Sequence, residues 1–214
     1  MDTTLIFVRH GESEANGKGF FAGQVDIGLS PRGKQQAEMT AQYIWEHYSV
    51  DMVYSSDLQR AYHTALPIAE ICDTEVVKSE QLREIFAGQW QGCCFDELQS
   101  RFSDTYGVWL TDIGNARPDG GETVEHLFHR IWSEVQRIAQ KSPGKTVVIV
   151  THATPIRAFL CRLHGYNLAQ MKDIPWVSNA SCSIVQVDGD QWKLLQANVD
   201  EHLAHLRTHF PANV

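Results

Sequence analysis

Two histidines in this chain each stand shortly after an apolar run, and their positions suggest chemistry. Residues 5–8 lead directly into Arg9 and His10, and residues 147–150 lead, after one threonine, into His152. Both runs are rich in β-forming residues and predict buried strands. In open α/β sheets, ligands bind beyond the carboxyl ends of the strands. The sequence therefore predicts that two imidazoles and a guanidinium lie where an active site is expected.

Arg60 is a second arginine that is expected at the same edge of the sheet. It lies one turn into a helix that is predicted to follow a short strand at residues 52–54. Guanidinium groups donate paired hydrogen bonds to anions that carry several oxygens. A lone histidine at a strand end is more often bonded to a backbone carbonyl, but here the pattern occurs twice and has arginines beside it. Two arginines and two imidazoles therefore indicate a phosphoryl ligand.

Five short motifs surround these groups and follow one another along the chain. They are Val8-Arg9-His10-Gly11-Glu12-Ser13-Glu14-Ala15-Asn16, Ser55-Ser56-Asp57 with Arg60 and Thr64, Leu82-Arg83-Glu84, Gly120-Gly121-Glu122-Thr123, and Val150-Thr151-His152. In this order the motifs resemble those of the histidine phosphatase superfamily, also called phosphoglycerate-mutase-like, whose signature is Arg-His-Gly. The resemblance extends over nearly the whole chain, and it implies an enzyme that transfers or hydrolyses phosphoryl groups.

The resemblance also implies a role for each of the charged residues. His10 is expected to be the nucleophile, which forms a phosphohistidine. Arg9, Arg60 and His152 are expected to bind the non-bridging oxygens and to stabilise charge during the transfer. Glu84 is expected to protonate the leaving oxygen and then to take a proton from the attacking water. A neutral imidazole is a competent nucleophile at pH 7, and neighbouring cations help to keep it neutral by depressing its pKa.

Three further residues are expected on the phosphate side of the site. The resemblance places Asn16 and Gly23 in the loop beside the phosphate, and Ala153 at the backbone that faces the transferred group, where family members usually have glycine. Because cationic and donor groups surround the phosphoryl group, neither a metal ion nor a cofactor is expected. The expected partner is a small phosphorylated metabolite.

The same groups serve phosphatases and mutases, and several departures from the mutase pattern separate the two. Cofactor-dependent phosphoglycerate mutases carry Asn and Arg in the run that corresponds to residues 19–23, a Tyr where this chain has Ala87, a Lys soon afterwards, and Gly-Asn where it has Ala153 and Thr154. Each departure removes a donor for a second phosphate. Residues 82–92 are instead similar to the same stretch in broad-specificity and α-ribazole-phosphate phosphatases.

The sequence therefore predicts a metal-independent phosphatase that hydrolyses small phosphate monoesters. Phe20, Phe21, Phe86 and Trp90 are expected to give it an apolar and less selective pocket. Two alternatives stay open at this point. One is a cofactor-dependent phosphoglycerate mutase, and the other is a non-catalytic module that binds a phosphorylated ligand.

The elements that position these residues alternate between strands and helices, which predicts an α/β fold. We expect a three-layer α/β/α sandwich with a mainly parallel sheet, in a single domain over residues 1–214. A hairpin with its turn at residues 188–190 is expected to add an antiparallel edge. Residues 11–29 are expected to form a loop, and residues 85–121 an insertion that lies as a lid over the active site.

Capping residues indicate where three of the helices begin. Ser30, which a proline follows, is expected to cap the first of them. Ser56 or Asp57 is expected to cap the helix that carries Arg60. Residues 122–123 are expected to open a long amphipathic helix, because apolar residues recur after them at helical spacing.

The composition argues against several other functions. The formal net charge is −8, which argues against nucleic acid as a partner because backbone phosphates require a basic surface. No apolar run approaches the ~20 residues of a membrane span, and the first strand begins too early for a signal peptide. The cysteines number five, without a Cys-x-x-Cys pair, so we expect no disulfide framework, no zinc ribbon, and a cytoplasmic location. The oligomeric state stays open, with a homodimer among the alternatives.

Two groups of histidines and one pair of cysteines lie outside these motifs. They are His126 with His129 on one expected helix, His202, His205 and His209 near the C-terminus, and Cys93 with Cys94. No further ligand accompanies either histidine group, so solvated helix histidines are favoured over metal ligands. The two cysteines are interpreted as packing or lid residues rather than as reactive thiols.

Overall fold

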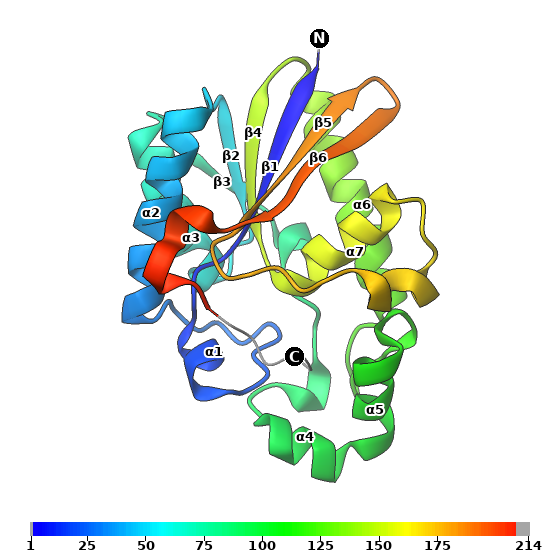
Figure 1. The fold of residues 1–214 in the computed structure, drawn as a ribbon. Helices are drawn as coiled ribbons and strands as arrows, with labels where there is room; N and C mark the ends of the chain where they lie inside the picture. Colours follow the sequence, from blue (N-terminus) through cyan, green and yellow to red (C-terminus); the bar gives the residue numbers. More distant parts are fainter. Residues whose placement is uncertain (1, 209–214) are drawn as a thin grey trace.

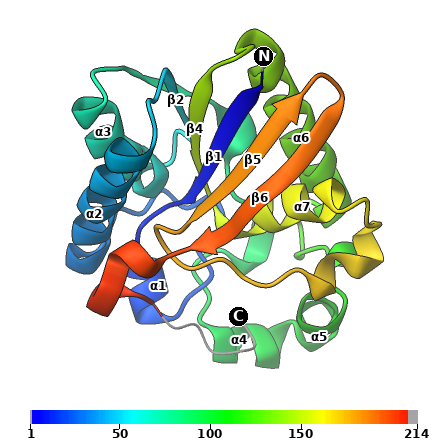
Figure 2. The ribbon, with the colours of Figure 1, turned by 45° about the horizontal axis from the view of Figure 1, so that its top comes forward.

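The computed structural model describes residues 2–208, which are built around a six-stranded sheet (Figure 1 and Figure 2). The strands are β1 (Thr3–Arg9), β2 (Met52–Ser55), β3 (Val76–Lys78), β4 (Thr146–Thr151), β5 (Cys182–Asp188) and β6 (Gln191–Val199). Their order across the sheet is β3-β2-β4-β1-β5-β6. Strands β1 to β4 are parallel, and β5 and β6 run antiparallel at one edge. The expected mainly parallel sheet with an antiparallel edge is confirmed.

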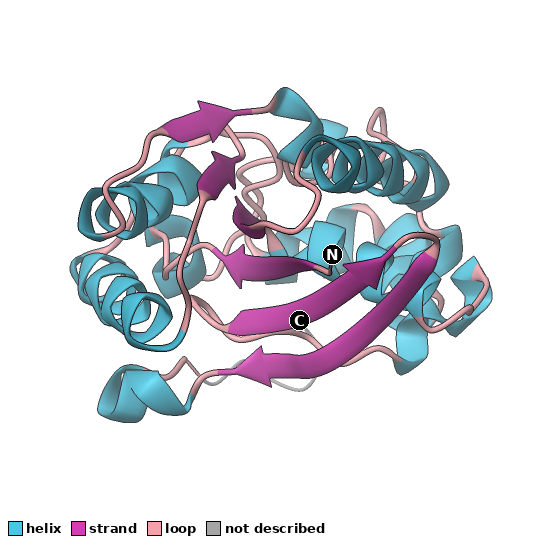
Figure 3. Cartoon of the chain, turned by 90° about the horizontal axis from the view of Figure 1, so that it is seen from above, coloured by secondary structure: helices cyan, strands magenta, loops and turns pink. Residues whose placement is uncertain are grey.

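Helices cover both faces of the sheet and complete the three layers (Figure 3). The long helices are α2 (Pro31–His47), α3 (Gln59–Ile71), α6 (Val124–Lys141) and α7 (Ala153–Leu163). Successive side chains of a strand point to opposite faces, so each strand serves two cores. Along β1, Ile6 and Val8 pack with the residues of α2 and α3, whereas Leu5 and Phe7 pack with those of α6 and α7.

Two of the expected helix starts are confirmed. The side chain of Ser30 accepts a hydrogen bond from the backbone N–H of Gly33 and caps α2, whose first residue is Pro31. Thr123 caps α6 in the same way, through the backbone N–H of His126. Each cap satisfies one of the backbone donors that a helix leaves unpaired at its first turn.

The expected cap of α3 is wrong, because the N-cap residue is Leu58 and neither Ser56 nor Asp57 caps the helix. The carboxylate of Asp57 is taken by an ion pair with Arg83, and the hydroxyl of Ser56 lies beside an imidazole in the site described below. A carboxylate from elsewhere does the capping, since Asp26 Oδ1 accepts the backbone N–H of Gln59 at 2.7 Å.

Short helices occupy the region beyond the carboxyl ends of the parallel strands (Figure 1). They are α1 (Glu14–Lys18), η1 (Glu80–Leu82), η2 (Gly88–Trp90), α4 (Phe95–Arg101), α5 (Ser103–Thr111), η3 (Ile113–Asn115), η4 (Leu168–Asp173) and η5 (Glu201–Leu206). The stretch 85–121, which contains α4 and α5, therefore lies over this edge as expected. The expected loop at residues 11–29 is wrong in one respect, since α1 forms within it around a capping box of Ser13 and Asn16.

Within residues 2–208, none of the helices combines the length and the apolar character that crossing a membrane requires.

The hydrophobic core is divided between the two faces of the sheet. The larger part lies on the side of α6 and α7, and it continues into the aromatic residues of the 85–121 stretch. This continuity anchors the lid to the body of the fold.

Candidate active site

The pairing of two neighbouring strands places His10 beside His152. Strands β1 and β4 are parallel neighbours, and Arg9 at the end of β1 pairs with Thr151 at the end of β4. The residues that follow are the two histidines, whose ring centroids lie 5.1 Å apart at an interplanar angle of 63°. The sheet register therefore brings together two side chains that are far apart in the sequence.

His10 is buried, and its hydrogen bonding identifies the nitrogen that is available for attack. Nδ1 lies 2.7 Å from the carbonyl oxygen of Gly11. A carbonyl only accepts, so Nδ1 carries the proton and Nε2 keeps its lone pair. Burial, followed by the nearby charges of Arg60 and Arg9, lowers the pKa of His10 well below its ordinary value. The imidazole is therefore neutral at pH 7.

His152 is held by a hydroxyl at the end of the adjacent strand. Its Nε2 lies 2.9 Å from Oγ of Ser56, which follows β2. Its Nδ1 is buried and has no hydrogen-bond partner within residues 2–208. Burial, followed by the charges of Arg60 and His10, lowers the pKa of His152 well below its ordinary value. This ring is also neutral at pH 7, with Nε2 hydrogen-bonded and Nδ1 without a partner among the described residues.

Arg9 and Arg60 bring two buried guanidinium groups to the same place. Arg9 Nη1 donates to the carbonyl oxygen of Val177 at 2.5 Å. Arg60 donates from Nη1 to the carbonyl of Val25 at 2.9 Å and from Nη2 to that of Gly23 at 2.6 Å. Burial lowers the pKa of each arginine to about 10, and the charge of Glu84 opposes that shift. Both arginines therefore stay charged at pH 7 and give the site its positive potential.

Glu84 reaches the site from a segment that is neither helix nor strand. Its Oε1 accepts the backbone N–H of Ile85 at 2.8 Å, and its Oε2 accepts that of Thr154 at 3.4 Å. The surrounding protein desolvates the carboxyl group and thereby raises its pKa, while these hydrogen bonds and Arg60 act in the opposite direction. A carboxyl group that keeps its proton to a higher pH is suited to act as a general acid.

One cavity, about 620 Å³ with its open mouth included, connects these groups. The predicted residues that line it are Arg9, His10, Asn16, Gly23, Arg60, Glu84 and Ala153. His152 is not among the lining residues, and it enters the site through its contact with the ring of His10. The structure thus brings all the predicted site residues together at the carboxyl end of the sheet.

The loop that carries Asn16 and Gly23 is held by polar contacts that the sequence did not predict. Asn179 donates from Nδ2 to the carbonyl oxygen of His10 at 3.0 Å and to Oδ1 of Asn16 at 3.3 Å. Asn16 Oδ1 also accepts the backbone N–H of Ser13 at 3.1 Å. Gly23 has φ +52°, and a Cβ there would lie 2.8 Å from the side chain of Ala87. Residue 23 therefore requires glycine for both conformation and space.

Most of the remaining lining of the cavity is aromatic. Apart from the residues already named, the lining is Ser13, Phe20, Phe21, Ala22, Phe95, Tyr106, Trp109, Thr154 and Trp176. These residues come from the loop that contains α1, from the 85–121 stretch, from the first turn of α7 (Thr154) and from the segment before β5. The cavity therefore combines cationic groups that suit a phosphoryl group with aromatic rings that suit an organic alcohol.

The predicted pocket aromatics are correct in part. Phe20 and Phe21 line the cavity, whereas Phe86 is 42% exposed and is not a lining residue. Trp90 is fully buried behind the wall, where its ring packs against Phe21, Tyr106 and Trp109. The irregular backbone of the lid gives no periodicity from which the direction of each ring could be predicted.

Among the histidines outside the motifs, His202 is not solvated as expected. His126 is exposed and pairs with Glu122, but His202 is half-buried, stacks on Tyr43 and hydrogen-bonds Thr40. His209 lies outside the described residues. Among residues 2–208, no group of three or more His, Cys, Asp and Glu side chains is arranged to hold a metal ion. All five cysteines are free thiols.

Comparison with known proteins agrees with this geometry. A family model described as the histidine phosphatase superfamily (branch 1) matches residues 5–200. The chain is 34% identical over 199 residues to phosphoserine phosphatase 1 of Hydrogenobacter thermophilus, covering 93% of each protein. It is 32% identical over 192 residues to the metal-independent phosphoserine phosphatase of Arabidopsis thaliana, covering 89% of this chain and 79% of that one. A mycobacterial glucosyl-3-phosphoglycerate phosphatase, solved as a complex with VO3, superposes with a TM-score of 0.85 at 27% identity and covers 92% of this chain and 99% of that chain.

Proposed function

The chain belongs to the histidine phosphatase superfamily, branch 1, and is a phosphoric monoester hydrolase. We propose that it hydrolyses small phosphate monoesters through a phosphohistidine on His10, without a metal ion. The observation that carries the proposal is the convergence of two neutral imidazoles, two charged guanidinium groups and one carboxyl group with a raised pKa. Phosphoryl transfer depends mainly on positioning and on electrostatic stabilisation, and this arrangement provides both.

In the first step, Nε2 of His10 attacks phosphorus in line with the ester oxygen. The new N–P bond forms as the P–O bond breaks, and Glu84 gives its proton to the departing alcohol. Arg9 and Arg60 balance the charge on the non-bridging oxygens, and Nδ1 of His152 donates a hydrogen bond to one of them. The free Nδ1 of His152 and the buried guanidinium groups support this assignment.

In the second step, water attacks the phosphohistidine and Glu84, now a carboxylate, takes its proton. The N–P bond breaks, the electron pair returns to Nε2 of His10, and inorganic phosphate leaves. Glu84 is then protonated again and ready for the next ester. The same residue serves both steps because its partners, the N–H groups of Ile85 and Thr154, hold the carboxyl group at the cavity surface.

We infer that the alcohol part of the substrate is apolar and carries no carboxylate. Within the described chain, the cationic side chains of the cavity lining are Arg9 and Arg60, and both are engaged at the phosphoryl end beside the neutral ring of His10. The rest of the wall includes Tyr106, Trp109 and other aromatic rings. A carboxylate or a second phosphate placed there would lose water without gaining a cationic partner. The same reasoning disfavours phosphoglycerate and hence the mutase reaction.

The substrate is thus proposed to be a small phosphorylated metabolite, and the free cysteines support the cytoplasm as the place where the enzyme meets it. The experiment that tests the function measures phosphate release in excess EDTA from 4-nitrophenyl phosphate, O-phosphoserine and 3-phosphoglycerate. We expect hydrolysis of the aryl ester at a kcat/KM above those of the two carboxylate esters. Isomerisation of 3-phosphoglycerate with a bisphosphoglycerate primer and without hydrolysis would contradict the proposal, as would ligand binding without turnover.

A further inference from the structure

The general acid of the proposed mechanism lies on backbone that no regular element supports. Residues 83–87 form neither helix nor strand, so the regular backbone hydrogen bonds of a helix or a sheet do not fix the position of Glu84. The distance between an acid and the oxygen that it protonates must nevertheless be controlled to a few tenths of an ångström. Side chains from elsewhere in the fold must therefore hold this segment.

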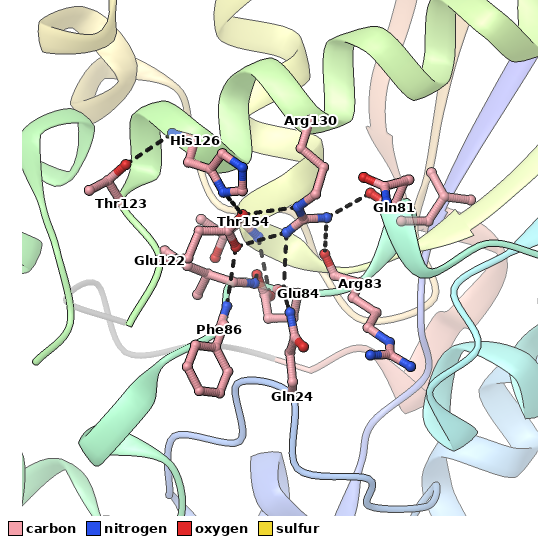
Figure 4. A network of polar contacts seen from close by, with 12 residues as sticks. Gln24, Gln81, Arg83, Glu84, Phe86, Glu122, Thr123, His126, Arg130 and Thr154 are labelled. Atoms are coloured by element: carbon pink, nitrogen blue, oxygen red, sulfur yellow. Dashed lines mark hydrogen bonds and ion pairs between the residues drawn. The ribbon is translucent and has the colours of Figure 1, made fainter. Parts of the chain in front are cut away.

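Arg130 of α6 holds the segment on the side that precedes Glu84 (Figure 4). Its Nη1 donates to the carbonyl oxygens of Gln81 at 2.6 Å and Arg83 at 3.0 Å. Its Nη2 lies 3.4 Å from the carbonyl oxygen of Glu84 itself. A planar guanidinium with five N–H donors can span several acceptors in this way, which an ammonium group cannot do.

Glu122 holds the segment on the side that follows Glu84 (Figure 4). Its Oε2 accepts the backbone N–H of Phe86 at 3.2 Å, and its own backbone N–H donates to the carbonyl of Phe86 at 2.8 Å. The carboxylate and the guanidinium of Arg130 are joined by two hydrogen bonds of 2.9 Å each. The side chains of this pair are 7% and 10% exposed, so the ion pair is largely shielded from solvent.

We propose that Arg130, through its ion pair with Glu122, is a positioning residue that clamps the backbone on both sides of Glu84 and thereby aims the acid at the leaving oxygen. Neither residue lines the cavity, so neither touches the substrate. The segment has other contacts, but none of them joins its two sides: Gln24 Nε2 donates to the carbonyl oxygen of Glu84 itself at 3.0 Å. Arg83 pairs with Asp57 and Thr151 bonds the carbonyl of Leu82, and both act before Glu84. The inference rests on the acid role that is proposed above for Glu84.

The test uses two esters that differ in their need for an acid. 4-Nitrophenyl phosphate has a good leaving group and depends little on protonation, whereas 2-phenylethyl phosphate has a poor one and depends on it strongly. The variant Arg130→Lys keeps the charge beside Glu122 but cannot span the three carbonyls. We expect kcat/KM for the alkyl ester to fall about tenfold more than that for the aryl ester, since misplacement by about 1 Å can cost ~10²-fold.

Three companion variants give the result its meaning. Arg130→Lys added to Glu84→Gln is expected to cause no further preferential loss on the alkyl ester, because the acid is already absent. Glu122→Gln, which keeps the shape of the side chain and an acceptor for Phe86, is expected to show the same preference to a smaller degree. Arg137→Lys is the matched control, since Arg137 also pairs on α6 with a glutamate, Glu134, and we expect less than about twofold change on either ester.

Two outcomes would overturn the inference. One is an equal loss on both esters in Arg130→Lys and in Glu122→Gln, which would indicate a structural role alone. The other is a preferential loss that persists in the Glu84→Gln background, which would indicate an action through some other group. Failure of the underlying function is recognised separately, because Glu84→Gln would then itself show no preference between the esters.

Discussion

Oγ of Ser56 lies 2.9 Å from Nε2 of His152, and the two residues stand at the ends of neighbouring strands, β2 and β4. The hydroxyl also accepts the backbone N–H of Leu58 at 3.4 Å, and the proposed mechanism assigns its own proton to Nε2 of the imidazole. Donation from Oγ to Nε2 places the proton of the ring on Nδ1. Ser56 thereby fixes both the direction and the tautomer of His152, as a partner on the second nitrogen generally does.

Replacing this hydroxyl is expected to affect both activity and stability. In Ser56→Ala, Nε2 of His152 becomes a buried nitrogen without a partner, which costs about 1–3 kcal/mol in the free energy of unfolding. The ring is also free to turn, and we expect kcat/KM to fall about tenfold, which corresponds to ~1.4 kcal/mol of transition-state stabilisation. Steady-state kinetics and urea unfolding measure the two effects.

Ser142→Ala is the control for Ser56→Ala. Ser142 is equally buried, but it lies at the end of α6, and its hydroxyl contacts the sulfur of Met52. This variant is expected to lose some stability and to keep the activity of the wild type. Equal activities of Ser56→Ala and Ser142→Ala would contradict the role of Ser56.

Glu84→Gln is expected to separate substrates by the basicity of their leaving groups. The amide keeps the size of the side chain but has no acidic proton, so esters of alkyl alcohols should lose about 10²–10⁴-fold in kcat/KM. 4-Nitrophenyl phosphate should lose much less, because its leaving group departs as an anion. A plot of log kcat/KM against the pKa of the leaving group measures the effect, and parallel lines for the variant and the wild type would argue against Glu84 as the acid.

The buried histidines are expected to make the fold less stable as the pH falls. The pKa values of His10 and His152 are lowered in the folded protein, mainly by burial. Below the ordinary histidine pKa of about 6.5, the unfolded chain binds protons that the folded chain does not, so unfolding becomes more favourable as pH decreases. Each histidine contributes up to about 1.4 kcal/mol per pH unit in this window.

Urea unfolding of the wild type and of His10→Asn between pH 5 and pH 7 (roughly the window that the ordinary histidine pKa defines) tests this linkage. Removing one of the two buried histidines should make the dependence of the free energy of unfolding on pH shallower. Contributions from groups that both proteins share cancel in the difference. Identical slopes for the two proteins would show that His10 is not held neutral by burial.

Gly23 and Gly19 form a matched pair for testing the phosphate loop. Both have positive φ, +52° and +71°, but only at Gly23 would a Cβ meet neighbours within 4 Å, namely Ala87 and Gln91 at 2.8 Å. The carbonyl of Gly23 also accepts from Arg60. Gly23→Ala should therefore displace the guanidinium and weaken inhibition by inorganic phosphate about tenfold, the equivalent of one charged hydrogen bond.

Gly19→Ala should cost only the strain of a left-handed residue, about 1–2 kcal/mol, and leave inhibition by phosphate unchanged. Gly19 ends α1, where its backbone N–H donates to carbonyl oxygens of that helix, and it does not line the cavity. Competition of inorganic phosphate with 4-nitrophenyl phosphate measures the comparison. If both alanine variants bound phosphate as tightly as the wild type does, the hydrogen bond from Arg60 to the carbonyl of Gly23 would not contribute to phosphate binding.

Local patterns in the sequence were sufficient to predict the groups that stand at strand ends. His10 and His152 follow apolar runs directly, so their position at one edge of the sheet follows from the elements alone. Their neighbouring positions depend on the order of the strands, which places β1 beside β4. The partners Ser56 and Asn179 could not be predicted for the same reason, because each reaches a histidine from another strand or loop.

The lid and the acid segment show the limits of sequence patterns more clearly. Trp90 was expected in the pocket, but it is buried behind it, and Trp109 and Trp176 line the wall instead. Trp90 and Trp176 lie in or beside irregular backbone, where no period of 2 or 3.6 residues assigns a direction to a side chain, and Trp109 lies in the short helix α5, which the sequence did not predict. Arg130 was on a predicted helix, but its contacts with the carbonyls before Glu84 exist only in the folded chain.

The most direct test of the mechanism is the position of the phosphoryl group in the trapped enzyme. The protein is mixed with excess 4-nitrophenyl phosphate, quenched with alkali, which preserves phosphohistidine, and mapped by mass spectrometry. The account predicts the mass of one phosphoryl group on the peptide that contains His10, and no adduct or turnover above a few per cent in His10→Ala, with His129→Ala as an exposed, active control. A phosphoryl group on another residue, or full turnover by His10→Ala, would contradict it.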